Sequence, residues 1–230
     1  SSVSLFGCHV ADSGSAQSLS GEDTGVINQD FAFFRVTAEK EESETSNLSF
    51  KFTSSVPGLG DINLTSSIFY DVYDEQRWNF SVRVKPTTPL AMIVSGAVDE
   101  GNDYGYNVIF RGASTGLDSI AQNFELTASI SKQAGENFLN ANKRLYAGAS
   151  RTNITGALLM PCDAYITSLK YWGRALDNYS LHQHILDYDN AGIDDIYQNI
   201  SPLAPQNLDI TNQKMLALDW RFSNLTSSNV

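Results

Sequence analysis

Residues 144–149 (RLYAGA) and 164–176 (AYITSLKYWGRAL) form the stretch of this chain that decides its fold. The first segment begins with a basic residue, continues through two apolar positions and ends in a corner of small residues, which is typical of a strand before a tight bend. The second is an amphipathic strand that ends at Trp172 and breaks at Gly173. Together they predict two late strands of a β-sheet, followed by a short helix.

Alternation of apolar and polar residues continues through the rest of the chain. In residues 47–53 (NLSFKFT) the side chains of Leu48, Phe50 and Phe52 fall on one strand face. Further strands are predicted at residues 67–73, 79–85, 106–110 and 124–130. Turn-forming sequences are predicted at residues 57–61, 99–103, 112–116 and 134–137. Many short strands at this spacing predict an all-β fold, an antiparallel β-sandwich or jelly roll.

Only one segment has a helical pattern, a short helix near residues 177–188. Asp177 suits the N-cap position, Leu181 and Ile185 fall on one helical face, and Gly192 ends the pattern.

Composition places the chain among folded globular proteins. Its 230 residues are 42% hydrophobic and carry a net charge of -11, with scattered lysines and arginines. Nucleic-acid binding requires a basic surface, so we expect no nucleic-acid partner. No apolar run approaches the length of a membrane span, so we expect no membrane insertion. The acidic balance fits an extracellular or particle-surface protein or a calcium binder, although solubility alone also explains it.

The two cysteines, Cys8 and Cys162, leave two interpretations open. The first strand of a jelly roll often neighbours a late strand, so a disulfide between these residues is geometrically reasonable. Two unpaired thiols fit the sequence equally well.

Sequons for N-glycosylation are more frequent than the residue frequencies predict. Seven are present, where chance would give about three. Their acceptors are Asn47, Asn63, Asn79, Asn153, Asn178, Asn199 and Asn224. This excess favours a glycoprotein that passes through a secretory route.

The late strands resemble the closing segment of laminin-G-like and pentraxin-like modules, which share the concanavalin A-like jelly roll. There, a leucine-tyrosine-isoleucine-glycine strand precedes one that ends in aromatic-x-arginine-alanine-leucine, and residues 145–148 and 172–176 are similar. Residues 78–84 (WNFSVRV) look like the tryptophan-led central strand of these families. The resemblance covers roughly residues 48–192, mostly at structural positions. It implies a binding or assembly module rather than an enzyme, and it names no ligand.

The sequence suggests one sandwich domain over residues 1–195 and a different segment over 196–230. That segment begins with a proline-rich linker and continues into an alternating strand at residues 214–222 (KMLALDWRF). A similar strand usually opens a laminin-G-like module, so this one either opens a following module or returns to the same sandwich. Together with a start that lacks Met, it suggests a piece of a larger polypeptide.

Catalytic motifs are not recognisable. Related glycoside hydrolases carry a glutamate-x-aspartate-x-x-glutamate motif, and here the nearest carboxylates, in residues 71–75 (DVYDE), do not match it. His182 and His184 are two positions apart on the predicted helix and point to different faces, so we expect both at the surface rather than on zinc. We predict that the chain is not an enzyme.

Calcium is the one cofactor that the resemblance suggests, through oxygen ligands in loops at the sandwich rim. The densest oxygen source is the loop of Asp99, Asn102 and Asp103, and residues 187–190 and 194–195 come second. An ordinary acidic hairpin turn explains the first loop without an ion.

Tyr104 and Tyr106 follow this loop and are the candidates for stacking on a sugar. Ordinary packing at a strand edge explains them as well. The sequence therefore predicts a structural or assembly module of a large extracellular or virion-surface protein, with neighbouring modules as partners. A calcium-dependent glycan-binding adhesion module is the alternative.

Overall fold

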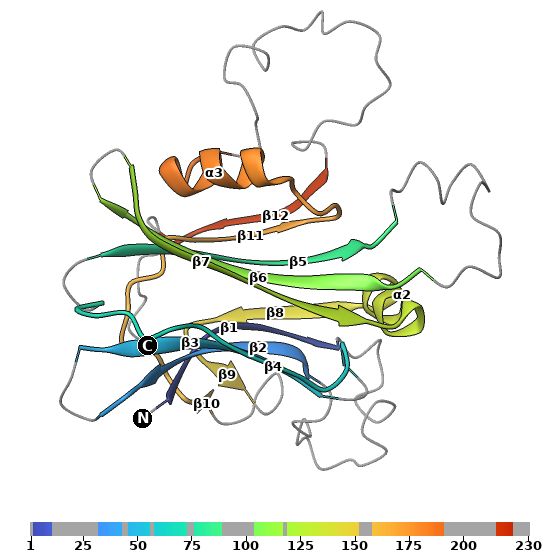
Figure 1. Cartoon of the computed structure of the whole chain (residues 1–230), viewed down its shortest axis with the longest axis horizontal. Coiled ribbons are helices and arrows are strands. Elements are labelled where there is room, and N and C mark those ends of the chain that lie inside the picture. The colour runs from blue at the N-terminus through green and yellow to red at the C-terminus, as the bar shows by residue number, and fades with distance from the viewer. Residues whose placement is uncertain are drawn as a thin grey trace, which may run out of the picture. The chain divides into compact units, whose positions relative to one another are not determined.

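The computed structural model describes residues 2–10, 32–42, 46–55, 58–72, 76–88, 104–116, 119–151, 158–190 and 215–222 (Figure 1). Most of these residues lie in β-strands, so the predicted all-β character is confirmed. Strand pairs with a described register are antiparallel. In this part of the chain no helix is long and apolar enough to span a membrane.

Among the described residues, the strands form four sheets. The largest has the order β4–β3–β2–β1–β8 and contains β1 (Ser2–Val10), β2 (Ala32–Lys40), β3 (Leu48–Ser54), β4 (Ile62–Thr65) and β8 (Lys143–Ala147). A three-stranded sheet has the order β5–β6–β7 and contains β5 (Arg77–Pro86), β6 (Tyr106–Gly116) and β7 (Ser119–Ile130). The remaining pairs are β9 (Ser150–Arg151) with β10 (Leu158–Leu159), and β11 (Ser168–Trp172) with β12 (Leu216–Arg221).

The chain divides into two compact units. The first comprises residues 1–75, 81–111 and 124–164, and the second comprises residues 76–80, 112–123 and 165–230. β11 and the helix α3 (Asn178–Leu186) belong with β12 in the second unit.

An aromatic core joins the two larger sheets within the first unit. The ring centroids of Phe52 and Phe110 are 5.9 Å apart, those of Phe50 and Phe124 are 5.7 Å apart, and Phe34 stacks on Phe52 at 5.4 Å. Phe52 and Phe110 are fully buried. The predicted alternation of β3 is therefore confirmed, with Leu48, Phe50 and Phe52 inward.

The first strand lies between β2 and the late strand β8. Cys8 is opposite Phe34 on one side and Leu145 on the other. The first strand and the late strand β8 are therefore neighbours in this sheet.

A second helix, α2 (Lys132–Asn140), corrects the prediction of only one. Residues 134–137 were predicted to form a turn, because glycine and asparagine are common turn residues. A Cβ on Gly135 would lie 2.2 Å from Cδ2 of Tyr106, so the absent side chain lets the helix pack on this ring.

Two further predictions were wrong. Residues 112–116 were expected to turn, but they continue β6, where Ala113 and Ser114 are fully buried. Residues 67–73 were expected to form a strand, but the described part contributes a single bridge, between Phe69 and Leu48. The strand that pairs with β3 on the side away from β2 is β4.

The helix predicted near residues 177–188 is confirmed as α3, although it ends at Leu186. The carboxylate of Asp177 caps it by accepting the Ser180 N–H at 2.7 Å. At its other end Arg77 donates to the carbonyl oxygens of Ile185 (2.8 Å) and Leu186 (3.1 Å), which satisfies exposed helix carbonyls. Gly192 lies outside the described residues.

The strand near the chain end returns to pair with β11, with Leu169 opposite Trp220.

The aromatic core yields a stability prediction. Phe52→Ala removes a fully buried ring and leaves a cavity, so we expect a loss of about 3–5 kcal/mol in the free energy of unfolding. Urea denaturation followed by tryptophan fluorescence measures it. Tyr70→Ala is the control, because Tyr70 is 64% exposed and its loss should change stability by less than about 1 kcal/mol. Equal losses in the two variants would contradict the assigned core.

Candidate functional site

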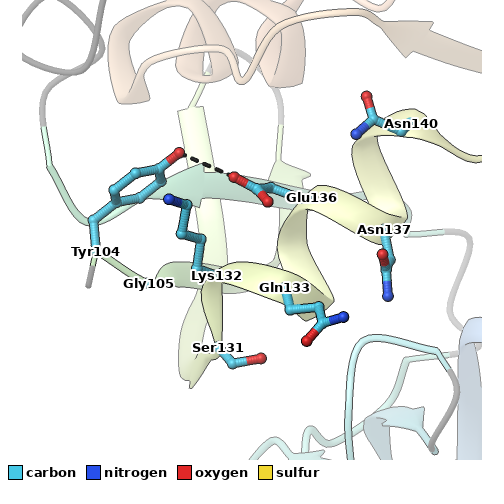
Figure 2. A pocket seen from close by; sticks show the side chains of 8 residues that line it. All are labelled: Tyr104, Gly105, Ser131, Lys132, Gln133, Glu136, Asn137 and Asn140. Atoms are coloured by element: carbon cyan, nitrogen blue, oxygen red, sulfur yellow. Dashed lines mark hydrogen bonds between the residues drawn. The ribbon is translucent and has the colours of Figure 1, made fainter. Parts of the chain in front are cut away.

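A polar pocket of about 690 Å³ lies beside α2 in the first unit (Figure 2). Its lining comes from the length of α2, with its N-cap residue, and from the two residues before β6. The lining residues are Tyr104, Gly105, Ser131, Lys132, Gln133, Glu136, Asn137 and Asn140.

Tyr104 lies at the centre of the charged side of this pocket. Its hydroxyl donates to Oε1 of Glu136 at 3.2 Å, and Nζ of Lys132 lies 4.8 Å from its ring centroid, within cation–π range. Figure 2 shows these three side chains converging, whereas Gln133 and Asn137 direct their amides elsewhere. The pocket thus presents a charged, aromatic part and an amide-lined part.

Tyr106, the second predicted stacking residue, belongs to the core. It is 5% exposed, and Gly135 of α2 packs against its ring. Burial, the hydrogen bond with Tyr104 and the charge of Glu136 raise the pKa of Tyr106 to about 12. Its ring therefore offers no free face to a sugar, and Tyr104 is the tyrosine that remains in the pocket.

None of the lining residues that α2 supplies was predicted from the sequence. The hydroxyl of Ser131 accepts the Ala134 N–H at 3.2 Å and caps the helix, and this N-cap was the available signal. Gly135 and Asn137 obscured it, because both residue types favour turns.

The predicted calcium ligands Asp99, Asn102 and Asp103 lie outside the described residues. Within the described ranges, no group of three or more His, Cys, Asp or Glu side chains is arranged to hold a metal ion.

The second calcium candidate, residues 187–190, is occupied by cationic side chains. Lys170 donates to the carbonyl oxygens of Tyr188 and Asn190, and Arg221 pairs with Asp189 at 3.0 Å. These contacts use oxygens that an ion would need, so the turn is explained without calcium. Asp194 and Asp195 lie outside the described residues.

His184 is buried, contrary to the prediction. It is 7% exposed, its ring lies 5.4 Å from that of Trp172, and Nδ1 is 3.1 Å from the carbonyl oxygen of Asn190. Burial and the charge of Lys170 lower its pKa to about 4, so it is neutral at neutral pH. His182 is exposed, as expected.

Both cysteines are free in this structure. Cys8 is fully buried in β1, and Cys162 is half-buried. The backbone N–H of Cys162 donates to the Gly148 carbonyl, and the Gly148 N–H donates to Leu5 in β1, both at 2.7 Å. The two cysteine segments are therefore connected through the corner that follows β8.

The sequon asparagines differ in exposure. Asn63 and Asn178 are exposed, whereas Asn47 and Asn79 are half-buried. The others, Asn153, Asn199 and Asn224, lie outside the described residues.

Comparison of the chain with models of protein families, with curated proteins and with solved structures finds no match. The laminin-G-like resemblance therefore rests on the motifs quoted from the sequence.

The free thiols yield a reactivity prediction. Burial raises the pKa of Cys8 to about 12, and burial and the nearby Asp163 also raise that of Cys162. Because the thiolate is the reactive form, we expect iodoacetamide at pH 8 to modify Cys162 slowly and Cys8 only after unfolding. Mass spectrometry of the native and the urea-unfolded protein measures this. The opposite result would establish the disulfide: the unfolded protein would take up no label before reduction and two labels after reduction.

Proposed function

We propose that this chain is a non-catalytic β-sandwich module of the concanavalin A-like jelly-roll class that binds a glycan beside Tyr104. The observation that carries the proposal is the pocket lining, which combines an aromatic ring with amides, a hydroxyl, one carboxylate and one ammonium. A sugar presents hydroxyls that both donate and accept hydrogen bonds, and it also has an apolar ring face. A lining of this kind complements both features.

The fold supports the class of module. Neighbouring first and late strands and an aromatic core shared by two sheets are what a jelly-roll sandwich requires. Exposed sequons at Asn63 and Asn178 support an extracellular or particle-surface glycoprotein.

Calcium enters the proposal as a dependence to be tested. The loop of Asp99, Asn102 and Asp103 comes shortly before Tyr104 in the sequence. A calcium ion bound by this loop would therefore be held by residues that are close in sequence to a pocket residue. The experiment below therefore has a calcium arm and a chelator arm.

A structural assembly module is the second candidate, and exposed aromatic residues in the second unit favour it. Their exposed fractions are 106% for Tyr165, 60% for Tyr179, 48% for Trp220 and 39% for Tyr188. Large aromatic side chains are enriched at protein interfaces, and contact with a neighbouring module would bury them.

The glycan proposal predicts selective binding on a glycan array that depends on Tyr104. Tyr104→Ala removes the ring and its contacts with Lys132 and Glu136, so we expect at least a tenfold loss of affinity, about 1.4 kcal/mol. Tyr70→Ala is the matched control, because Tyr70 is exposed and does not line the pocket. Each protein is measured with calcium and with chelator.

The outcomes separate the candidates. Binding that Tyr104→Ala abolishes and Tyr70→Ala preserves supports the pocket, and loss with chelator adds calcium to it. Binding that survives in Tyr104→Ala contradicts this pocket. A flat array from a folded sample contradicts glycan binding and favours the assembly module. In that case the chain should associate in sedimentation experiments, and Trp220→Ser should weaken the association.

A further inference from the structure

A cluster of hydrogen-bond donors crosses β2, β1 and β8 on the sheet face opposite the aromatic core. Cys8 pairs with the core residue Phe34, so its neighbours Gly7 and His9 point to the other face. Tyr146 is opposite Gly7 and Arg144 is opposite His9. The donor cluster consists of His9, Arg35, Arg144 and Tyr146.

Gly7 lets Tyr146 lie across the sheet. A Cβ on Gly7 would lie 2.3 Å from the phenolic oxygen of Tyr146, so the ring occupies the space of the absent side chain. The hydroxyl is 3.1 Å from Nε2 of His9 and also hydrogen-bonds with Arg35, which pairs with Gly7 from the other side. Tyr146 thus links Arg35 to His9 over the backbone of β1.

The hydrogen bonds favour one tautomer of His9. Arg35 can only donate, so the Tyr146 oxygen accepts from it. We assign the tautomer that also uses the hydroxyl hydrogen, in which Tyr146 donates to Nε2 of His9 at 3.1 Å. Burial and the charges of Arg35 and Arg144 lower the pKa of His9 to about 4, so the ring is neutral at neutral pH. A neutral ring that accepts at Nε2 carries its hydrogen at Nδ1.

Nδ1 of His9 is therefore a buried donor that requires an acceptor. His9 is 2% exposed, and among the described residues Nδ1 has no hydrogen-bond partner. In the same part of the chain, the buried Nη1 of Arg144 also has no partner. A buried donor without an acceptor destabilises the folded chain, so this arrangement favours a bound group that only accepts hydrogen bonds.

The charges near His9 also favour a negatively charged group that accepts hydrogen bonds. The charges that act on His9 are those of Arg35 and Arg144, and both are positive. The carboxylate of Glu39 in β2 pairs with Lys51 of β3 at 3.5 Å, so its negative charge is already compensated. Guanidinium groups match planar or tetrahedral oxyanions through paired N–H donors.

We propose that the donor cluster binds an oxyanionic group, a carboxylate or a phosphate, held by Nδ1 of His9 and the guanidinium of Arg144, with Tyr146 and Arg35 positioning the ring. This site is independent of the glycan pocket. Arg35, Arg144 and Tyr146 are half-buried, so part of the donor cluster is exposed to solvent.

The test is thermal unfolding of the whole chain in acetate, in inorganic phosphate and in chloride at equal ionic strength and pH. Binding to the folded state raises Tm, by about 5–10 °C when the anion exceeds its Kd a hundredfold. The anion that produces the larger rise relative to chloride identifies carboxylate or phosphate as the ligand class. Arg144→Gln should remove the rise, and Lys51→Gln, which removes a positive charge from the same sheet, should keep it.

Arg144→Lys keeps the charge but loses the paired donors, so it serves as the test variant if Arg144→Gln fails to fold. In Arg144→Lys we expect at least half of the rise in Tm to disappear. Nitrogen-15 NMR supplies a second readout, because the anion should shift the His9 Nδ1–H resonance in the wild type. The proposal would be overturned if Tm were the same in chloride as in the oxyanions. It would also be overturned if both Arg144 variants kept the full rise in Tm. A chain that gains no stability from either oxyanion would contradict it as well.

Discussion

Burial of phenylalanine rings on one face of the five-stranded sheet is the constraint on which the rest of this structure depends. Phe34, Phe50 and Phe52 contact aromatic partners in the core. Because side chains alternate along a strand, committing one face to the core also determines what the other face carries. His9, Arg35, Arg144 and Tyr146 of β1, β2 and β8 therefore meet on the outer face.

Two glycines allow aromatic rings to approach the backbone, and each approach builds one of the proposed sites. Gly7 admits Tyr146 across β1, which brings the hydroxyl to His9. Gly135 admits the ring of Tyr106 against α2, which places the helix side chains next to Tyr104. In both cases an added Cβ would overlap a ring, so the cost of glycine in a regular element is offset by close packing.

The two proposed sites differ in the chemistry that they offer. The pocket beside Tyr104 is open and mixes donors with acceptors, which suits a ligand with many hydroxyls. The cluster around His9 is more buried and offers donors, which suits an anion. In a chain of net charge -11, such a local concentration of positive charge requires its own explanation, and a bound oxyanion provides one.

The sequence by itself determined the all-β class, the inward face of β3 and the helix capped by Asp177, because these features depend on local periodicity and capping. It also indicated Tyr104, through an aromatic residue beside an acidic loop. Only the tertiary structure decided that Gly135 lies in a helix, that Tyr106 and His184 are buried and that Lys170 occupies the turn after α3. The physical reason is that these outcomes depend on contacts between residues far apart in the chain, whereas residue type and spacing record only what neighbouring positions prefer.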